Sequence, residues 1–310
     1  MEHYWSLEEI RLNNAQVTIG SFDGVHLSHQ EIIQKMNSDA HLHNDPSLVI
    51  TFFPHPKKVL YPDLDHYYLT SPLKRASLIG ELGVDYVVTH PFNKKVANTS
   101  AEEFVRDIYH ATGMSQLWIG RDFALGKGRK GNLAFLRDKG LEFNFSVNVV
   151  KPITLEGEQI SSSRIRSSLK QGNLEKANRL LGRRFQLVGD VVPGDGRGKL
   201  LGIPTANLEI WNEQIVPNSG VYVCLARLGD RKWGAVTNIG VRPTFSDDSR
   251  ILRVEAHLLN FAEEIYSKKL DLTFITRLRD EKRFTNEHNL VKQILEDIEQ
   301  AKMVLADKIV

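Results

Sequence analysis

The sequence predicts a doubly wound α/β domain followed by a small antiparallel β-barrel with a C-terminal helix. Up to about Leu181, short apolar runs alternate with helical patterns, which is typical of a parallel sheet covered by helices on both faces. Beyond the segment LGRRF, extended segments rich in β-branched residues follow, separated by Gly, Pro, Asp and Asn. A chain of 310 residues can bury two cores, so we expect two domains, residues 1–183 and 184–310.

The expected strands of the first domain are short runs rich in Val, Ile, Leu and Phe. In chain order they are AQVTIG, SLVITFF, VDYVVTH, SQLWIG and FSVNVV. Helical patterns fall near residues 28–40, 72–82, 100–112 and 130–138, and two more cover 162–171 and 173–181. Ligands of such a sheet bind where its strands end and its helices begin, so the turns after these strands are the candidate sites.

The second domain has a different rhythm. Its expected strands are FQLVGDVV, GVYVCLARL, KWGAVTNIG, LRVEAHLL and LDLTFITRL. One amphipathic helix, over roughly residues 286–308, follows them. Its apolar side chains fall mostly on one face, which predicts that it packs against the barrel: Leu290, Ile294, Ile298 and Val304.

The amino-acid composition limits the classes of binding partner that we expect for this protein. The 40 Lys and Arg nearly balance the 38 Asp and Glu and are spread along the chain, so we expect no nucleic-acid partner. Cys224 is the single cysteine, which excludes an internal disulfide. No apolar run approaches the ~20 residues of a membrane helix, and the first ten residues do not resemble a signal peptide. We therefore expect a cytoplasmic protein that binds small molecules; its oligomeric state is not determined by the sequence.

The first candidate site is the segment GSFDGVHLSH, which joins a strand to a helix. Backbone N–H groups and the helix dipole favour phosphate at such a turn. His26 and His29 lie on the same side of the first helical turn and are able to donate hydrogen bonds to the charge that develops on a triphosphate. The alternative is an ordinary turn with two solvated histidines, and this short motif alone leaves both interpretations open.

The segment ISSSRIR favours the first interpretation. It places three serines at an expected helix start, with Arg166 one turn further on. A guanidinium group offers paired donors that suit a phosphate. Alternatively, one serine caps the helix and Arg166 is a surface residue.

A second candidate site opens the barrel. Five glycines fall within residues 189–202, so the backbone is able to approach a phosphate closely, although a plain barrel turn is the alternative. The PTAN segment that follows adds the Thr205 hydroxyl and the Asn207 amide, which suit Mg²⁺. In the strand VEAH, Glu255 and His257 face one side. If that side faces the glycines, Glu255 is placed to accept a proton from an attacking hydroxyl; otherwise it is simply solvated.

The first half resembles the adenylyltransferase module of bacterial bifunctional FAD synthetases. The segments that carry the resemblance are GSFDGVHLSH, the PHP of FFPHP, IGRDFALGKGRKGN and ISSSRIR, in this order. The resemblance implies that the FMN phosphate attacks ATP, with release of pyrophosphate. It implies catalytic roles for His26, His29 and Arg166. The implied ATP contacts are Gly20, Phe22, Asp23, Ser162 and Ser163, and the implied flavin contacts are His55 and Asp122.

The second half resembles the riboflavin kinase domain, through LGIPTAN, GVYVCLARL, AVTNIGVRPTF, VEAHLLNF and RLRDEKRF. The resemblance implies a six-stranded barrel that phosphorylates riboflavin with ATP and Mg²⁺. Glu255 would be the base for the ribityl hydroxyl, and Thr205 and Asn207 would hold the metal and ATP. The remaining implied contacts are Gly194, Gly196 and Gly202 with ATP, and Arg279 with the flavin.

One residue departs from the motif of the adenylyltransferase module, and this departure leads to three hypotheses. Ser28 replaces the glycine of the HxGH motif, at a helix start that approaches the nucleotide. The leading hypothesis is a bifunctional enzyme that makes FMN and then FAD. The alternatives keep only the riboflavin kinase, with the first half either a weakened adenylyltransferase or a regulatory module that binds flavin or nucleotide. Retention of both histidines, Arg166 and the three serines argues against the regulatory module, since a module that only binds would not need the residues expected to contact the ATP phosphates.

Overall fold

The computed structural model describes residues 1–64, 66–243 and 250–306. The chain divides into two compact units, Met1–Ser162 and Ser163–Val310. The domain boundary predicted between residues 183 and 184 lies after two helices that group with the second unit, α7 (Ser162–Lys170) and α8 (Leu174–Leu181). Across the described parts of the chain, we find no helix whose length and apolar character would let it span a membrane.

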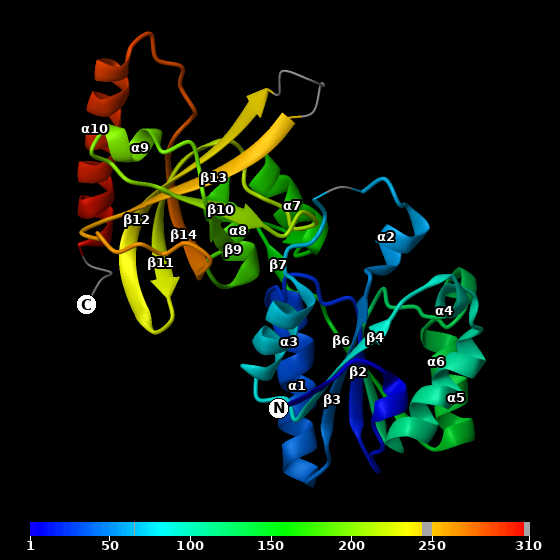
Figure 1. Cartoon of the computed structure of the whole chain (residues 1–310). Coiled ribbons are helices and arrows are strands. Elements are labelled where there is room, and N and C mark those ends of the chain that lie inside the picture. The colour runs from blue at the N-terminus through cyan, green and yellow to red at the C-terminus, as the bar shows by residue number, and fades with distance from the viewer. Residues whose placement is uncertain (65, 244–249, 307–310) are drawn as a thin grey trace. The chain divides into compact units, whose positions relative to one another are not determined.

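The first unit contains a six-stranded parallel sheet with strand order β1-β4-β3-β2-β5-β6 (Figure 1). Its strands are β1 (Glu2–Tyr4), β2 (Gln16–Ile19), β3 (Ser47–Phe53), β4 (Tyr86–Pro91), β5 (Gln116–Gly120) and β6 (Ser146–Val150). Five of them were predicted. The edge strand β1 was not, because three residues are too few to show a period.

Helices cover both faces of this sheet, as a doubly wound fold requires. Helices α1 (Leu27–His43) and α3 (Pro72–Gly80) lie on one side in Figure 1, and α5 (Ala101–Thr112) and α6 (Leu133–Phe143) on the other. The remaining elements are short: η1 (Leu7–Glu9), α2 (Pro56–Leu60), α4 (Lys94–Asn98), η2 (Lys127–Arg129) and the hairpin β7 (Thr154–Leu155) and β8 (Glu158–Gln159). Helices α2 and α4 were not predicted, because five residues show no helical period.

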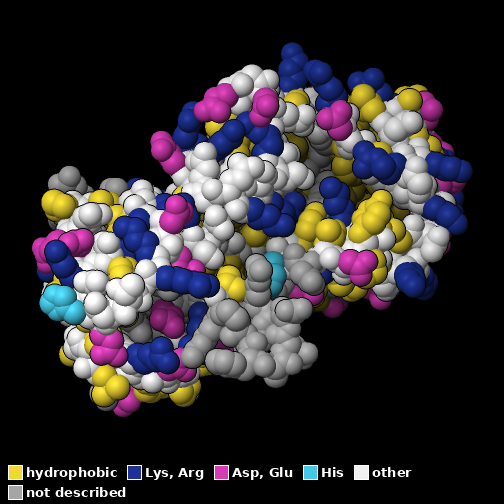
Figure 2. All heavy atoms as spheres, turned by 90° about the horizontal axis from the view of Figure 1, so that it is seen from above, with side chains coloured by type: hydrophobic (Ala, Val, Ile, Leu, Met, Phe, Trp, Pro, Cys, Tyr) yellow, Lys and Arg dark blue, Asp and Glu magenta, His cyan; other side chains and the backbone are white. Residues whose placement is uncertain are grey.

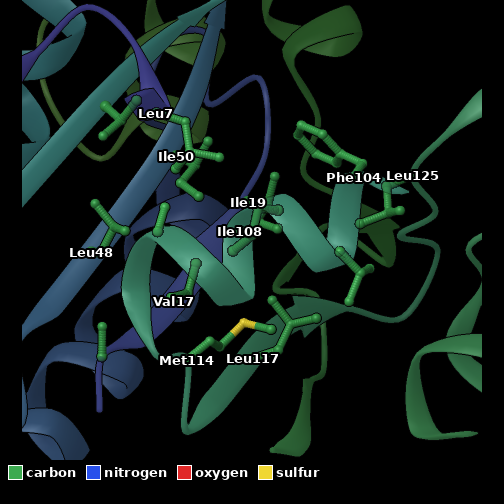
Figure 3. Close-up of a cluster of buried hydrophobic side chains, with 14 of the residues drawn as sticks. Leu7, Val17, Ile19, Leu48, Ile50, Phe104, Ile108, Met114, Leu117 and Leu125 are labelled. Carbon is green, nitrogen blue, oxygen red and sulfur yellow. The ribbon is translucent and has the colours of Figure 1, made fainter. Parts of the chain in front are cut away.

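The alternation of side chains along the central strands divides the core of this unit in two. Val49 of β3 packs with α1 and α3, whereas its neighbours Leu48 and Ile50 pack on the opposite face. Figure 3 shows this second cluster, in which residues of β2, β3 and β5 meet residues of α5: Val17, Ile19, Leu48, Ile50, Leu117, Phe104 and Ile108.

The connections leave the sheet in opposite directions around β2. The chain runs from β2 to its neighbour β3 on one side, and later returns to β5 on the other side. This is a topological switch point, where ligands bind beyond the carboxyl ends of the strands. The turn that follows β2 is GSFDGVH, so the fold places the first candidate site at the switch point.

The second unit is built on a closed six-stranded barrel with order β10-β13-β12-β11-β14-β9. Its strands are β9 (Gln186–Val192), β10 (Ala206–Ile210), β11 (Gly220–Leu228), β12 (Arg231–Pro243), β13 (Arg250–Leu258) and β14 (Lys269–Arg279). All neighbouring strands run antiparallel. The sixth strand, β10, was not identified from its own sequence pattern, because its polar Asn207 and Glu209 interrupt the apolar run. The end of the AVTNIGVRPTF motif, residues 244 and 245, lies outside the described residues.

Helix α10 (Glu287–Leu305) packs along the outside of the barrel. Ile298, Ala301 and Leu305 are buried against Val223 and Ile275 of the barrel wall. The prediction of one amphipathic C-terminal helix is confirmed, with residues 307 and 308 of the predicted range outside the described residues. A single turn, α9 (Arg197–Leu200), interrupts the glycine-rich loop.

Candidate active sites

The turn after β2 is held by its own residues. The ring of Phe22 lies against Gly20, so a side chain at position 20 would meet that ring. Both oxygens of the buried Asp23 carboxylate accept the backbone N–H of Leu69 at 3.1 Å, and Oδ1 also accepts that of Thr70 at 3.2 Å. Asp23 thus clamps the segment before α3 to this turn, and its contact with ATP stays a prediction.

The backbone of this turn is strained. Phe22 and Val25 have φ angles of 44° and 39°. These angles lie in the left-handed region, which a β-branched residue such as Val25 rarely adopts. Such strain is concentrated at ligand sites, because there the surrounding structure holds the chain in a demanding shape.

His26 and His29 come together at the start of α1, as predicted. His26 is the N-cap of the helix, and its ring stacks on that of His29 with the centroids 3.5 Å apart and an interplanar angle of 18°. The edge of Phe22 contacts His29, with the centroids 5.1 Å apart. Two imidazoles are therefore held side by side at the positive end of a helix dipole, where an anion is stabilised.

Ser28 lies between the two histidines, and its side chain is already bonded within the unit. The hydroxyl accepts the backbone N–H of Ile153 at 3.2 Å and donates to the carbonyl of the same residue at 3.4 Å. The side chain that replaces the motif glycine therefore ties the start of α1 to the segment before β7.

The serine-rich segment contributes to both units. The Ser162 hydroxyl donates to the backbone carbonyl of Asp23 at 2.9 Å, so it reaches the turn after β2. Ser163 and Arg166 belong to the second unit, on α7, where Ser163 is exposed and Arg166 is buried.

The two predicted flavin contacts of the first unit have unlike surroundings. His55 is buried and caps α2, because its ring Nδ1 accepts the backbone N–H of Lys57 at 3.0 Å. The backbone N–H of His55 donates to the Tyr68 hydroxyl at 2.7 Å. Asp122 is exposed just after β5, and its carbonyl accepts from Arg129 Nη2 at 2.7 Å. His55 follows β3 and Asp122 follows β5, so both lie at the carboxyl edge of the sheet.

The second unit contains a pocket of about 640 Å³ beside the barrel wall. It collects five of the predicted site residues: Gly196, Thr205, Asn207, Glu255 and Arg279. Basic side chains from three segments, Arg197, Arg253 and Lys282, line it together with acidic ones. The viewed face in Figure 2 likewise intersperses Lys and Arg with Asp and Glu.

Strand register aligns three polar residues on the pocket wall. Asn207 of β10 lies directly opposite Glu255 of β13, and Asn238 of β12 lies opposite Glu255 on the other side. Residues directly opposite in antiparallel strands share one face of the sheet, and all three line the pocket. Their neighbours Val254 and Ala256 are buried inside the barrel, which confirms the predicted facing of Glu255.

The glycine-rich loop covers the predicted metal ligands. A Cβ on Gly194 would collide with the Asn207 amide, and one on Gly198 would lie 3.2 Å from the Thr205 hydroxyl. Gly202, like Gly196, adopts a left-handed backbone, with φ near 75°. The glycines therefore let the loop lie directly on the PTAN segment, which favours the binding interpretation over a plain turn.

Arg253 links this loop to Glu255. Its Nη1 donates to Asp195 Oδ2 at 3.2 Å and lies 3.8 Å from Glu255 Oε1. His257, the next residue on the same face, lies 2.8 Å from the Pro204 carbonyl through Nδ1. Both contacts join β13 to the loop that covers Thr205 and Asn207.

Arg279 lines the pocket, but its guanidinium group is bound by the protein. Nε and Nη2 form a bidentate pair with the Asp297 carboxylate of α10, at 2.9 and 2.7 Å. Asp297 is almost fully buried, so this pair fastens the end of β14 to α10. Arg279 therefore shapes the pocket whether or not it also contacts a ligand.

The donor atoms at the loop suit a hard cation. Thr205 offers a hydroxyl and Asn207 a carbonyl oxygen, with Glu255 opposite. Within the described ranges, no group of three or more His, Cys, Asp or Glu side chains is arranged to hold a metal ion. A cation here would thus take its other ligands from water and phosphates, which is how Mg²⁺ is held in kinase sites.

The pocket residues that sequence reasoning missed include Asn238, Arg253 and Asp297. Asn238 had a usable signal, since it is a polar residue on the opposite face of β12 from the buried Thr237 and Ile239. Arg253 lies two residues before Glu255 and so shares its face. Asp297 had none, because only the docking of α10 brings it to Arg279.

Family models match the chain in two consecutive parts. The model described as FAD synthetase matches residues 9–164, and the one described as riboflavin kinase matches residues 181–305. Relatives that match over nearly the whole length are described as bifunctional riboflavin kinase/FMN adenylyltransferase. The Pseudomonas fluorescens protein is 36% identical over 290 residues, covering 93% of this chain and 92% of that one. The Escherichia coli K12 protein is 34% identical, with 91% and 90% covered.

One solved structure is similar over nearly the whole chain. It is a Streptococcus pneumoniae protein described as a macrolide-efflux protein, with a TM-score of 0.88 and 30% identity, and the match covers 97% of this chain and 98% of that one. Both units therefore have counterparts in a single solved chain.

Proposed function

Because this chain belongs to the bifunctional riboflavin kinase/FMN adenylyltransferase family, we propose that its two reactions occur at separate sites, one in the barrel pocket and one at the turn after β2. The enzyme phosphorylates riboflavin to FMN with ATP, and it adenylylates FMN to FAD with release of pyrophosphate. The kinase-only alternative is not favoured, since the FAD synthetase model matches the first half and the full-length relatives bear both activities in their description.

We place riboflavin phosphorylation in the pocket of the second unit, and one observation carries this assignment: the row of Asn207, Glu255 and Asn238 beneath the glycine-rich loop. Glu255 accepts the proton of the ribityl hydroxyl as the hydroxyl oxygen attacks the γ-phosphorus of ATP; the bond from this phosphorus to the β–γ bridging oxygen breaks, and ADP leaves. Asn207 and Asn238 flank the carboxylate and hold the reacting groups in line with it.

Other parts of the pocket suit riboflavin and ATP, respectively. Ile203, Val221 and Val236 are apolar and suit the isoalloxazine ring. The loop at Gly194–Gly198 and the PTAN segment suit the ATP phosphates, with Thr205 and Asn207 the residues that would hold Mg²⁺. When bound, that ion supplies charge stabilisation for the transferring phosphoryl group.

We place adenylyl transfer at the turn after β2. His26 and His29, stacked at the start of α1, stabilise the charge that develops as pyrophosphate leaves. The FMN phosphate is itself the nucleophile, so the chain supplies positioning and charge rather than a covalent intermediate. Ser163 and Arg166 stay predicted phosphate ligands, and Asp122 and His55 predicted flavin contacts.

Two variants test the division of labour. Glu255→Gln should lower FMN formation by about 10²–10⁴-fold while FMN is still converted to FAD at the parental rate, because only the kinase base is lost. His29→Ala should lower FAD formation and spare FMN formation. The measurement is chromatographic separation of flavins after incubation with ATP, Mg²⁺ and either riboflavin or FMN.

His288→Ala is the matched control, since this exposed histidine of α10 lies outside the pocket and outside the turn after β2. Equal loss of both activities in either Glu255→Gln or His29→Ala would contradict the two-site assignment. The boundary at residues 183 and 184, Mg²⁺ as the metal and a cytoplasmic location stay predictions.

A further inference from the structure

Arg75 is a fully buried arginine on α3, behind the turn after β2. Its Nη1 donates to the Ser21 carbonyl at 2.8 Å, and its Nη2 donates to the Phe52 carbonyl at 2.9 Å. Ser21 lies just after β2, and Phe52 is the next-to-last residue of β3. One side chain thus binds the carboxyl ends of two neighbouring strands, at the edge where ligands of such a sheet bind.

Within the part of the chain that the structure describes, Arg75 forms no ion pair, and the Asp23 carboxylate acts on it only at longer range. Its guanidinium group bonds to the two backbone carbonyls, and its Nε has no hydrogen-bond partner among these residues. Burial lowers the pKa of Arg75 from its usual value, while the charge of Asp23 opposes that change. Arginine nevertheless stays protonated in proteins, so a whole positive charge lies inside the unit.

Asp23 and Arg75 join the turn after β2 to the region of α3, each by hydrogen bonds to the backbone of the other segment. Asp23, in the turn, binds the backbone N–H groups of Leu69 and Thr70, which precede α3. Arg75, on α3, binds backbone carbonyls on the strand side. The Thr70 hydroxyl adds a third link by accepting the N–H of Gly24 at 3.2 Å. The turn after β2 is therefore bonded to the start of α3 by side chains from both segments.

A purely structural role accounts poorly for this arrangement. A buried charge that is not hydrogen-bonded to a carboxylate is costly, even with the Asp23 carboxylate in the same region, and well-packed apolar residues of similar volume are often at least as stabilising. The cost falls if an anion binds close by, because the buried cation then gains a counter-charge in a medium of low dielectric. The turn braced by Arg75 is the one proposed above to receive the ATP phosphates.

We infer that Arg75 is a positioning residue for adenylyl transfer, which braces the turn after β2 against the end of β3 and places a buried positive charge, bonded to backbone carbonyls rather than to a carboxylate, behind the phosphate site. This inference rests on the proposed location of adenylyl transfer in the first unit. It concerns a residue outside the HxxH and serine-rich motifs.

Three variants separate charge from bonding. Arg75→Met removes both. Arg75→Lys keeps the charge but reaches fewer carbonyls. Thr51→Val is the matched control, because the Thr51 hydroxyl donates to the same Ser21 carbonyl at 2.9 Å and carries no charge. The measurements are KM for ATP and kcat in FAD formation, inhibition by pyrophosphate, FMN formation, and the thermal unfolding of each variant.

Arg75→Met should raise KM for ATP and the inhibition constant of pyrophosphate by about tenfold or more, with FMN formation at the parental rate. Arg75→Lys should keep both constants near the parental values and lower kcat several-fold, because one carbonyl is released. Thr51→Val should leave both constants within about twofold. A merely structural role would instead lower only the fraction of folded enzyme, so that KM and the kcat per folded enzyme would both stay parental in Arg75→Met and in Arg75→Lys.

A folded Arg75→Met protein with parental KM for ATP would overturn the inference. If Arg75→Met does not fold, Arg75→Lys decides, since a parental kcat in that variant would contradict the two-carbonyl brace. Failure of the underlying assignment looks different: His29→Ala would then leave FAD formation unchanged. Loss of FAD formation in His29→Ala with parental behaviour of both Arg75 variants would reject the inference alone.

Discussion

Ser28 occupies the position of the motif glycine, and the rings of the two histidines beside it stack on each other. Its hydroxyl is engaged on both sides, as acceptor and as donor, by the main chain of Ile153. The side chain is buried within its own unit, where these bonds satisfy it. The substitution has thus added a tether between α1 and the segment before β7, which explains how a larger residue is accommodated at this helix start.

Removal of this tether should cost stability in the first unit. We expect Ser28→Ala to destabilise that unit by about 1 kcal/mol, because two hydrogen bonds of a buried hydroxyl are lost. The midpoint of urea inactivation of FAD formation measures this, while that of FMN formation should not move. Ser38→Ala, at an exposed serine of the same helix, is the control; an equal shift in both variants would show that the Ile153 bonds contribute nothing.

At the level of elements, side-chain contacts fix how a strand meets its neighbours. The pair of Arg279 and Asp297 joins β14 to α10, and both residues line the pocket of the second unit. On the sheet of the first unit, His90 near the end of β4 accepts the N–H of Leu7 through Nδ1 at 3.3 Å. This bond requires an unprotonated Nδ1, so it holds η1 against β4 only while His90 is neutral.

The first unit should therefore lose stability in mild acid. Burial lowers the pKa of His90 below its ordinary 6.5, so the unfolded chain binds a proton at a higher pH than the folded chain does. The resulting stability is fully present above about pH 6.5 and is lost as the pH falls through the lowered value. Thermal inactivation at pH 5 to 8, with residual FAD formation assayed at pH 7.5, should show this fall.

His90→Gln keeps an acceptor and removes the titration, so its midpoint should depend less on pH than that of the parent. His43→Gln is the control. The pKa of His43 is raised, mainly by its hydrogen bond to the backbone of Asp39, so its effect has the opposite sign and the acid-side fall should persist. Equal pH dependence in the parent and in His90→Gln would remove His90 from the explanation.

On the scale of the whole molecule, two compact units each have a core and a candidate site of their own. The single cysteine provides a reporter for one of them. Cys224 is fully buried inside the barrel, and burial raises the pKa of its thiol to about 12. Because the thiolate is the reactive form, the native barrel should protect this residue from thiol reagents.

Labelling of Cys224 should therefore follow the unfolding of the barrel. In a urea series at pH 8 with Ellman's reagent, we expect no rapid reaction in the native protein and a labelling midpoint equal to that for loss of FMN formation. The Cys224→Ser variant gives the background. Rapid labelling of the native protein would contradict the burial of Cys224 inside the barrel.

The sequence by itself determined the order of most strands and helices and the residues that make up the local motifs. Strand and helix periods identified most elements, and the His26–His29 spacing and the PTAN segment were readable because each lies within one turn or one loop. Short elements such as β1 and α2 were missed, since a few residues show no period.

Only the tertiary structure decided which distant residues meet. The alignment of Asn238 with Asn207 and Glu255 depends on strand register, which is set by packing and hydrogen bonding across the barrel. The burial of Arg75 likewise depends on how α3 packs behind the turn after β2. A local sequence pattern shows which face of a strand or helix a residue lies on. The distant residue that it contacts on that face is determined only by the packing of the whole chain.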